Sequence, residues 1–277
     1  MRDLKDRIAV VTGAGGGIGR ALALELARAG CHLVLADIDE ARTRDLAGAI
    51  EALGRRALSV ATDVRDIAAV ERLLATTLST MGACHLAFNN AGVFHAATLV
   101  ETSNEQWHRV VDTNLWGVIN GSRTFGAHFR KQGEGHIVNT ASAAGFFPMP
   151  GMGSYSTTKF AIIGFSEQLR WELAADGVGV TVLCPGVVRT GIGKAPGAGL
   201  EHVDVDELVR KSPPPEGLAR KAIAAVRGDR ARVRYGVDAY ILSWLRAWPM
   251  WLLDPIGRFM GRTAIKFLRD GVPKKLG

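Results

Sequence analysis

Short apolar segments alternate with longer amphipathic segments over the first 185 residues of the chain. The apolar segments are rich in Val, Leu and Ile and predict β-strands at residues 7–11, 32–37, 56–60, 84–88, 136–139 and 178–183. The amphipathic segments predict helices at residues 18–29, 39–53, 67–80, 104–131 and 154–175. Strands that are apolar throughout are buried on both faces, and helical crossovers join parallel strands. The pattern therefore predicts a single-domain α/β fold, a doubly wound parallel sheet with helices on both faces.

The pattern changes after the sixth predicted strand. Residues 191–215 combine glycines, prolines and mixed charges without a period, which is typical of a lid or a binding loop. A helix at 216–227 and a strand at 232–235 are expected to complete the sheet. Residues 238–277 predict a C-terminal amphipathic helical extension. We therefore expect one main domain at 1–237, lid included, followed by a helical tail.

Charge and tryptophan are concentrated in the last part of the chain. Residues 200–277 carry 15 basic and 9 acidic residues, whereas residues 1–199 carry 19 and 18. Trp244, Trp248 and Trp251 lie within eight residues of one another in the same part. Such a tail fits a peripheral membrane contact, packing against a neighbouring subunit, or closure over the protein's own core. Nucleic-acid binding is not expected, because no recognition fold accompanies the charge.

The cysteines and the N-terminus bear on the compartment. Cys31, Cys84 and Cys184 are far apart, and no His/Cys cluster has the spacing of a metal site, so we expect buried thiols and no metal. The N-terminal residues lack the apolar core of a signal peptide, and no apolar stretch is long enough for a transmembrane helix. We expect a cytoplasmic protein, with membrane association left open by the tail.

A glycine-rich run joins the first predicted strand to the first predicted helix. Glycine lets the backbone turn sharply and approach a pyrophosphate closely, while the N–H groups at the helix start face the anion. This position favours a dinucleotide site of the Rossmann type over a merely flexible turn. The residues expected to contact the cofactor here are Gly13, Gly15, Gly16, Gly17, Ile18 and Gly19.

Asp37 ends the second predicted strand, 18 residues after Gly19. A carboxylate at this place accepts hydrogen bonds from the ribose hydroxyls of NAD and repels the 2′-phosphate of NADP. Ile38 is apolar, and the glycine run holds no Lys or Arg, so NAD is the expected cofactor. Asp63 and Val64 follow the third strand, where the Asp is placed to reach the adenine amino group. The alternative for Asp37 is a solvated acid in a loop.

Taken together, several motifs resemble those of the short-chain dehydrogenase/reductase family. They occur in the family's order over about residues 5 to 190. The matching residues are Thr12 to Gly19, Asn89 to Gly92, Asn114, Ser142, Tyr155 to Lys159, and Pro185 with Gly186.

The resemblance implies roles for several of these residues. Asn114 is expected to hold a water-linked proton relay to Lys159, and Thr190 is expected near the nicotinamide carboxamide. Homo-oligomers, tetramers or dimers, are common in the family, with the helices at 104–131 and 154–175 at the interfaces. Further cofactor contacts are expected from Asn90, Ala91, Gly92, Tyr155, Lys159, Pro185, Gly186 and Val188.

Tyr155 and Lys159 are four residues apart at the start of a predicted helix, so their side chains share a face. A phenol has a pKa near 10, and a nearby ammonium together with an oxidised nicotinamide favours the phenolate. Tyr155 is therefore the expected acid/base of a hydride-transfer reaction. Ser142, just past the fifth strand, is placed to bind the substrate oxygen. The competing class is a nonenzymatic NAD-binding or membrane-recruited interaction protein.

The residues after Ser142 carry no charge and include several large apolar side chains. They favour a pocket for a lipophilic secondary alcohol or ketone over a sugar or hydroxy acid. The alternative is that they are core residues flanking a helix. The residues expected at this pocket, besides Ser142 and Tyr155, are Phe94, Phe147, Met149, Met152 and Ile192.

Overall fold

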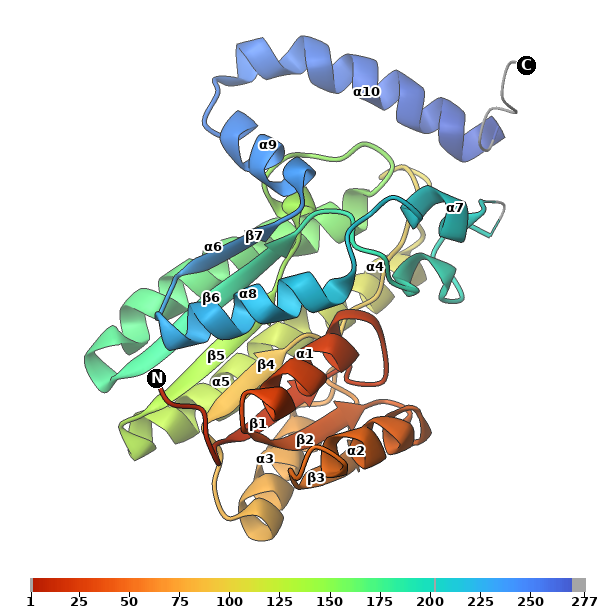
Figure 1. Ribbon diagram of the computed structural model, residues 1–277. Coiled ribbons are helices and arrows are strands. Elements are labelled where there is room, and N and C mark those ends of the chain that lie inside the picture. The colour runs from red at the N-terminus through yellow and green to blue at the C-terminus, as the bar shows by residue number, and fades with distance from the viewer. Residues whose placement is uncertain (1, 202, 271–277) are drawn as a thin grey trace.

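The computed structural model describes residues 2–201 and 203–270, and its centre is a seven-stranded parallel sheet (Figure 1). The strand order is β3-β2-β1-β4-β5-β6-β7. The order reverses beside β1, as in a doubly wound fold, so the predicted fold class is confirmed. The strands are β1 (Ile8–Thr12), β2 (His32–Asp37), β3 (Ala57–Ala61), β4 (Leu86–Asn89), β5 (Gly135–Thr140), β6 (Val178–Pro185) and β7 (Arg232–Tyr235).

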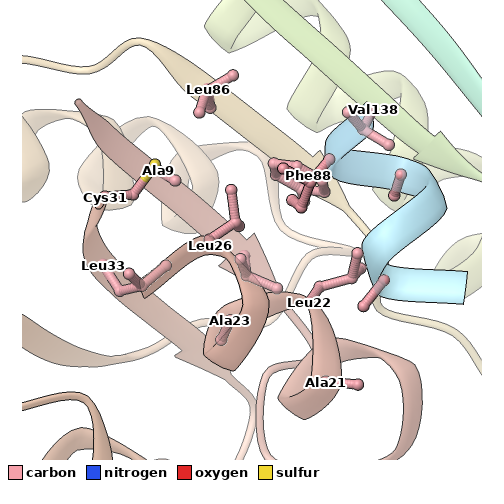
Figure 2. Packing of buried hydrophobic residues seen from close by; sticks show 14 of the residues in the cluster. Ala9, Ala21, Leu22, Ala23, Leu26, Cys31, Leu33, Leu86, Phe88 and Val138 are labelled. Carbon is pink, nitrogen blue, oxygen red and sulfur yellow. The ribbon is translucent and has the colours of Figure 1, made fainter. Parts of the chain in front are cut away.

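Helices cover both faces of the sheet. One face carries α1 (Gly17–Arg28), α2 (Arg44–Glu51) and α8 (Pro215–Arg227), and the other carries α3 (Ile67–Met81), α5 (Gly117–Gln132) and α6 (Gly153–Leu173). Side chains alternate across each strand, so β1 contributes to the cores on both faces. Figure 2 shows the core on the α1 side, where Leu22 and Leu26 of α1 lie in one buried cluster with Phe88 of β4.

The predicted helix at 104–131 is interrupted by one wide turn. Helix α4 (Asn104–Val111) begins at a capping box formed by Ser103 and Gln106. Residues Asp112–Trp116 then form a π-turn before α5 continues in the same direction. A π-turn inside an α-helix holds one extra residue and is frequent at functional sites.

The lid at 191–215 contains short helices and is held against the body of the protein. It includes a turn at Ile192–Lys194 and helix α7 (Val205–Val209), which the sequence did not predict. The Ala96 N–H donates to the Ala198 carbonyl (2.7 Å), and the Arg109 guanidinium donates to the carbonyls of Pro196 and Gly197. The predicted lid segment is therefore folded and attached to α4, and its role as a lid stays a prediction.

The tail forms the expected helical extension, as α9 (Val237–Leu245) and α10 (Met250–Asp270). The remainder of the predicted tail, residues 271–277, lies outside the described residues. Within the part of the chain that the structure describes, no helix has both the length and the apolar character needed to cross a membrane.

Candidate active site

The glycine-rich loop follows β1 and opens α1, as the sequence predicts. Gly13 and Gly17 adopt positive φ angles of 64° and 52°, which glycine tolerates without strain. A Cβ on Gly19 would lie 2.1 Å from the Gly13 carbonyl oxygen, so no larger residue fits there. No side chain caps the N-terminus of α1 at Gly16, and its first turn carries no acid. The loop and the helix start therefore fit a pyrophosphate.

Asp37 closes this loop from the end of β2. Its carboxylate is 5% exposed and accepts a hydrogen bond from the Gly15 N–H (2.9 Å). Arg42 Nη1 lies 3.6 Å from Asp37 Oδ1, and its side chain also lies beside Gly15 and Gly16. The buried carboxylate at this strand end fits the hydroxyls of a ribose, as predicted.

Sequence reasoning missed Arg42. The turn at Glu40–Thr43, capped by the Asp39 carboxylate on the Ala41 N–H, folds the chain back and brings Arg42 to the loop. The sequence analysis expected a regular helix from Asp39, and such a helix gives no indication that Arg42 lies at the loop. The signal for the turn is the capping residue Asp39, two residues after the acid that ends β2.

The predicted adenine-side residues lie in the segment after β3. The Asp63 carboxylate pairs with Arg65 (Nη2 to Oδ2, 2.6 Å), and the hydrogen bonds from this guanidinium lower the pKa of Asp63. Val64 is buried, and its carbonyl accepts a hydrogen bond from Asn120 on α5 (3.0 Å). Ile38, the next residue after Asp37, is exposed. Their contacts with a cofactor stay predictions.

The segment after β4 is tied to β1. Thr12 Oγ1 accepts hydrogen bonds from the N–H groups of Asn90 (3.0 Å) and Ala91 (3.1 Å). The Asn90 side chain donates to the Thr12 carbonyl (3.1 Å) and accepts from the Thr140 hydroxyl (3.3 Å). These bonds hold together the carboxyl ends of three adjacent strands, at the edge where an open α/β sheet binds ligands.

Asn114 lies at the centre of the π-turn and is fully buried. Its side-chain oxygen accepts from the Val93 N–H (2.7 Å), and its side-chain nitrogen donates to the Val93 carbonyl (2.9 Å). Gly92 is adjacent, since a Cβ there would lie 3.2 Å from Asn114 Oδ1. The Asn114 amide therefore fixes the chain after β4, and its place in a proton relay stays a prediction.

Ser142, Tyr155 and Lys159 come together at the ends of β5 and α6. The Ser142 side chain lies close enough to the Tyr155 hydroxyl to lower the pKa of Tyr155. Ser142 Oγ also donates to the Pro185 carbonyl (3.4 Å) and accepts from the Ala144 N–H (3.2 Å). Lys159 Nζ lies 5.4 Å from the centre of the Tyr155 ring and donates to the Thr140 carbonyl (2.9 Å). The predicted constellation thus forms one cluster.

Burial dominates the electrostatics of this cluster. Burial raises the pKa of Tyr155, and the Ser142 side chain opposes that rise only in part. Burial also lowers the pKa of Lys159 to about 8. These side chains alone therefore do not lower the Tyr155 pKa, because desolvation of the phenolate outweighs the effect of the Ser142 side chain.

The low pKa of Lys159 makes folding stability depend on pH in a defined direction. The pKa is about 8 in the folded protein and 10.5 ordinarily, so the unfolded chain holds more protons between these values. The free energy of unfolding should therefore rise with pH through this window. Relative to Lys159→Met, the wild type should gain roughly 2 kcal/mol between pH 7 and pH 9.5. Urea unfolding of both proteins at both pH values measures this difference, and parallel profiles would contradict it.

The segment after β6 contacts both the glycine loop and the tail. Thr190 lies beside Gly17, where a Cβ would be 3.4 Å from the Thr190 side chain. The Val187 N–H donates to the Asp238 carboxylate (2.7 Å), and this carboxylate fills the space beside Gly186. Val188 is buried. The segment is therefore held at the same edge of the sheet as the Ser142 cluster.

The apolar residues predicted at the pocket occupy different environments. The Phe94 ring packs edge-on against Tyr155, with ring centres 5.1 Å apart. Phe94 also packs against a buried apolar cluster of the lid. Met149 and Met152 are half-buried, Phe147 is buried, and Ile192 is 41% exposed. The structure brings Phe94 against the Tyr155 ring. All five residues stay predictions as substrate contacts. The buried members of the lid cluster are Ala96, Leu200, Val203 and Val205.

The family model for short chain dehydrogenases matches residues 7–199, which include the glycine loop and the Ser142 cluster. The chain belongs to the short-chain dehydrogenase family. This membership confirms the resemblance inferred from the motifs. The matched region ends inside the lid, so the tail lies outside it.

Relatives of this short-chain dehydrogenase include two proteins of Mycobacterium tuberculosis. "Probable oxidoreductase EphD" is 39% identical over 249 residues, which are 86% of this chain and 42% of EphD. The chain thus spans about two fifths of the length of that relative. SadH, whose name also describes an oxidoreductase, is 31% identical over 99% of this chain and 98% of SadH. A crystal structure of a family member from Burkholderia phymatum in complex with NAD matches with a TM-score of 0.83, at 34% identity over 91% of this chain and 96% of that one.

Proposed function

We propose that this short-chain dehydrogenase interconverts a lipophilic secondary alcohol and its ketone with NAD(H). The observation that carries the proposal is the cluster of Ser142, Tyr155 and Lys159 at the edge of the sheet where the glycine loop and Asp37 also lie. A buried carboxylate and a phosphate-type loop at one end of this edge, and an acid/base cluster at the other, suit a redox reaction on a small molecule.

NAD is supported as the cofactor by two independent features. The Gly13–Gly19 loop accepts no side chain at Gly19, and the Asp37 carboxylate is buried at the place of the adenosine ribose. The similar structure from Burkholderia phymatum is a complex with NAD. When bound, the nicotinamide supplies the hydride acceptor or donor. Beyond the glycine loop and Asp37, the residues proposed to hold it are Ile38, Asp63, Val64, Asn90, Ala91, Gly92, Tyr155, Lys159, Pro185, Gly186, Val188 and Thr190.

The chain's own residues then bind the substrate oxygen and transfer its proton. The Ser142 hydroxyl donates a hydrogen bond to that oxygen and holds it beside the Tyr155 hydroxyl. Tyr155 accepts the alcohol proton in oxidation and returns a proton to the ketone oxygen in reduction. Lys159 stabilises the phenolate and holds the cofactor ribose, and Asn114 supports proton exchange with solvent through Lys159. A cation added beside the half-buried phenol favours its charged form, which offsets the upward effect of burial on the Tyr155 pKa.

The apolar surroundings of Tyr155 support the lipophilic substrate class. Phe94 contacts the Tyr155 ring and continues into the apolar cluster of the lid. A hydrocarbon substrate would replace water at such a surface, whereas a hydroxy acid would need a cationic partner. The family commonly forms oligomers, and we propose a homotetramer or homodimer. Trp116 at the π-turn and Trp171 on α6 expose large apolar surfaces that such contacts would bury.

The test of the proposed function is nicotinamide absorbance with NAD and then NADP, against a panel of apolar and polar secondary alcohols. Turnover of apolar alcohols with NAD is the expected result. Activity confined to polar alcohols would contradict the substrate class. Binding of NADH without turnover of any alcohol or ketone in either direction would favour a nonenzymatic NAD-binding protein.

Cofactor choice gives a separate prediction at Asp37. Asp37→Ala should weaken NADH binding by about 10-fold to 100-fold, because a charged hydrogen-bond acceptor for the ribose is lost. NADPH should gain relative to NADH, since the change also frees Arg42 from its 3.6 Å partner and leaves a guanidinium facing a 2′-phosphate. Fluorescence titration with both dinucleotides measures the ratio. The double variant Asp37→Ala/Arg42→Ala is the control and should lose the NADPH gain; an unchanged preference in Asp37→Ala would remove Asp37 from this role.

A further inference from the structure

Helices α9 and α10 lie outside the layers that enclose the sheet. In Figure 1, α10 crosses one end of the molecule and reaches the side where α7 lies. Helix α9 is anchored by the buried Ala239 and by the bond between Asp238 and the Val187 N–H. Helix α10 is anchored by the buried Leu253 and by Leu268, which lies against Gly151. Most of the remaining surface of α10 is solvent-facing.

This surface is unusually apolar. Among the residues that the structure describes, ten of the nineteen exposed large apolar side chains belong to α9 and α10. Trp251 is 73% exposed and Phe259 is 72% exposed. An apolar surface gathered on two helices indicates an interaction site, whereas scattered exposed residues would not. The ten residues are Val237, Tyr240, Ile241, Trp244, Met250, Trp251, Leu252, Ile256, Phe259 and Ile265.

Helix α10 carries an apolar stripe and, beside it, a basic stripe. Leu252, Ile256 and Phe259 have the spacing of one helix face. Three exposed cations follow one another at every fourth position along the neighbouring face. These cations are Arg258, Arg262 and Lys266.

The charge of this surface is not neutralised from within. Arg258 pairs with Asp254 (2.7 Å), and Asp238 is used by the Val187 N–H. Arg262 and Lys266 form no ion pair with any residue whose side chain the structure describes. The surface is therefore cationic as well as apolar, and a fitting partner must supply both negative charge and hydrocarbon.

We propose that α9 and α10 dock the protein on the surface of an anionic lipid bilayer. Apolar and tryptophan side chains beside a basic stripe are the features of a helix that lies in the membrane interface. Anionic headgroups complement Arg262 and Lys266, and the long basic side chains reach the headgroups while the apolar stripe enters the acyl region. Against a second copy of this surface, the same cations would face each other across a two-fold axis, which disfavours self-association.

The helix that carries the docking surface reaches the candidate pocket. Leu268, at the far end of α10, packs against the lid cluster, and Phe94, which contacts Tyr155, packs against the same cluster. A membrane-docked protein would thus hold its pocket next to the bilayer, where lipophilic alcohols and ketones partition. This last step rests on the proposed function, whereas the docking itself does not.

Flotation of the full chain with vesicles tests the docking. Vesicles of phosphatidylcholine with 30% phosphatidylserine are compared with vesicles of phosphatidylcholine alone. The wild type should bind the anionic vesicles and lose that binding in high salt. Arg262→Glu/Lys266→Glu should reduce binding by about tenfold or more. Trp251→Ser/Phe259→Ser should also reduce it, because the apolar contribution is lost. The matched control, Arg44→Glu/Lys131→Glu, makes the same change of charge at exposed positions outside the tail and should bind as the wild type does.

Two kinds of result would overturn the docking. The first is equal binding to both vesicle types, or no loss of binding in Arg262→Glu/Lys266→Glu. The second is absence of vesicle binding together with self-association that Trp251→Ser/Phe259→Ser abolishes in analytical ultracentrifugation, which would assign the surface to a second copy. Turnover of a water-soluble alcohol without vesicles is measured in parallel. Because the four substituted positions lie outside the Ser142 cluster, loss of docking and failure of the proposed enzyme activity are distinguishable.

Discussion

Tyr155→Phe is expected to lower turnover by a factor of about 10³ while leaving NADH affinity nearly unchanged. The substitution removes only the hydroxyl, whose pKa the neighbouring Ser142 side chain lowers. It keeps the ring that packs against Phe94 at 5.1 Å, so the fold and the apolar wall should be retained. Steady-state kinetics in both directions, together with a fluorescence titration of NADH, separate the loss of chemistry from a loss of binding.

Tyr240→Phe is the matched control for this substitution. Tyr240 lies on α9 with 47% of its surface exposed, and the same hydroxyl loss there should leave turnover at the wild-type level in the absence of vesicles. Wild-type turnover in Tyr155→Phe would assign the proton transfer to another group. A parallel collapse of NADH affinity would mean that the Tyr155 hydroxyl serves mainly to build the cofactor site.

Gly19→Ala should damage both stability and cofactor binding. The added Cβ would lie 2.1 Å from the Gly13 carbonyl oxygen and 2.7 Å from Asn90 Nδ2, so the loop must move away from α1. Overpacking of this kind costs about 1–3 kcal/mol of unfolding free energy. Displaced N–H groups at the helix start no longer converge on a phosphate, so NADH affinity should fall sharply. Urea unfolding and NADH titration report the two effects.

Gly48→Ala is the control for the glycine substitution. Gly48 lies inside α2, and a Cβ there meets nothing within 4 Å, so alanine should stabilise the helix by about 0.5–1 kcal/mol. A Gly19→Ala protein that bound NADH as tightly as the wild type would contradict the assignment of this loop to the cofactor.

The hydrophobic pattern was sufficient to predict the sheet and most of the helices. Its strands are buried on both faces, so their apolar runs carry a strong signal, and all seven predicted strands are present. Two predicted helices were wrong in detail. The segment from Asp39 begins as a tight turn because the Asp39 carboxylate caps the Ala41 N–H, and the long helix at 104–131 contains the π-turn. In both places a polar side chain, Asp39 or Asn114, is hydrogen-bonded to nearby backbone, and a pattern of apolar positions is insensitive to such bonds.

The candidate site likewise contains residues that the sequence predicts and residues that it does not. Motif spacing identified Ser142, Tyr155 and Lys159, which the structure brings together. Tyr155 and Lys159 were predictable as neighbours because residues four apart on a helix share a face. Motif spacing did not identify Arg42 or Arg109, whose positions depend on how loops fold back. Spacing also did not reveal that burial raises the Tyr155 pKa, since burial cannot be judged from spacing.

The single extra residue of the π-turn sets the angular offset between two helices. If an ordinary α-helical turn without the extra residue joined the two helices, α5 would be rotated about the helix axis by about 100° from its present orientation relative to α4. Arg109 on α4 holds the lid, and Asn120 on α5 holds the Val64 carbonyl beside the predicted adenine site. Deleting one residue from Asp112–Trp116 would leave a regular helix that could satisfy only one of these two attachments. The π-turn thus sets the rotation of α5 relative to α4, so that residues of one continuous helix hold opposite ends of the site.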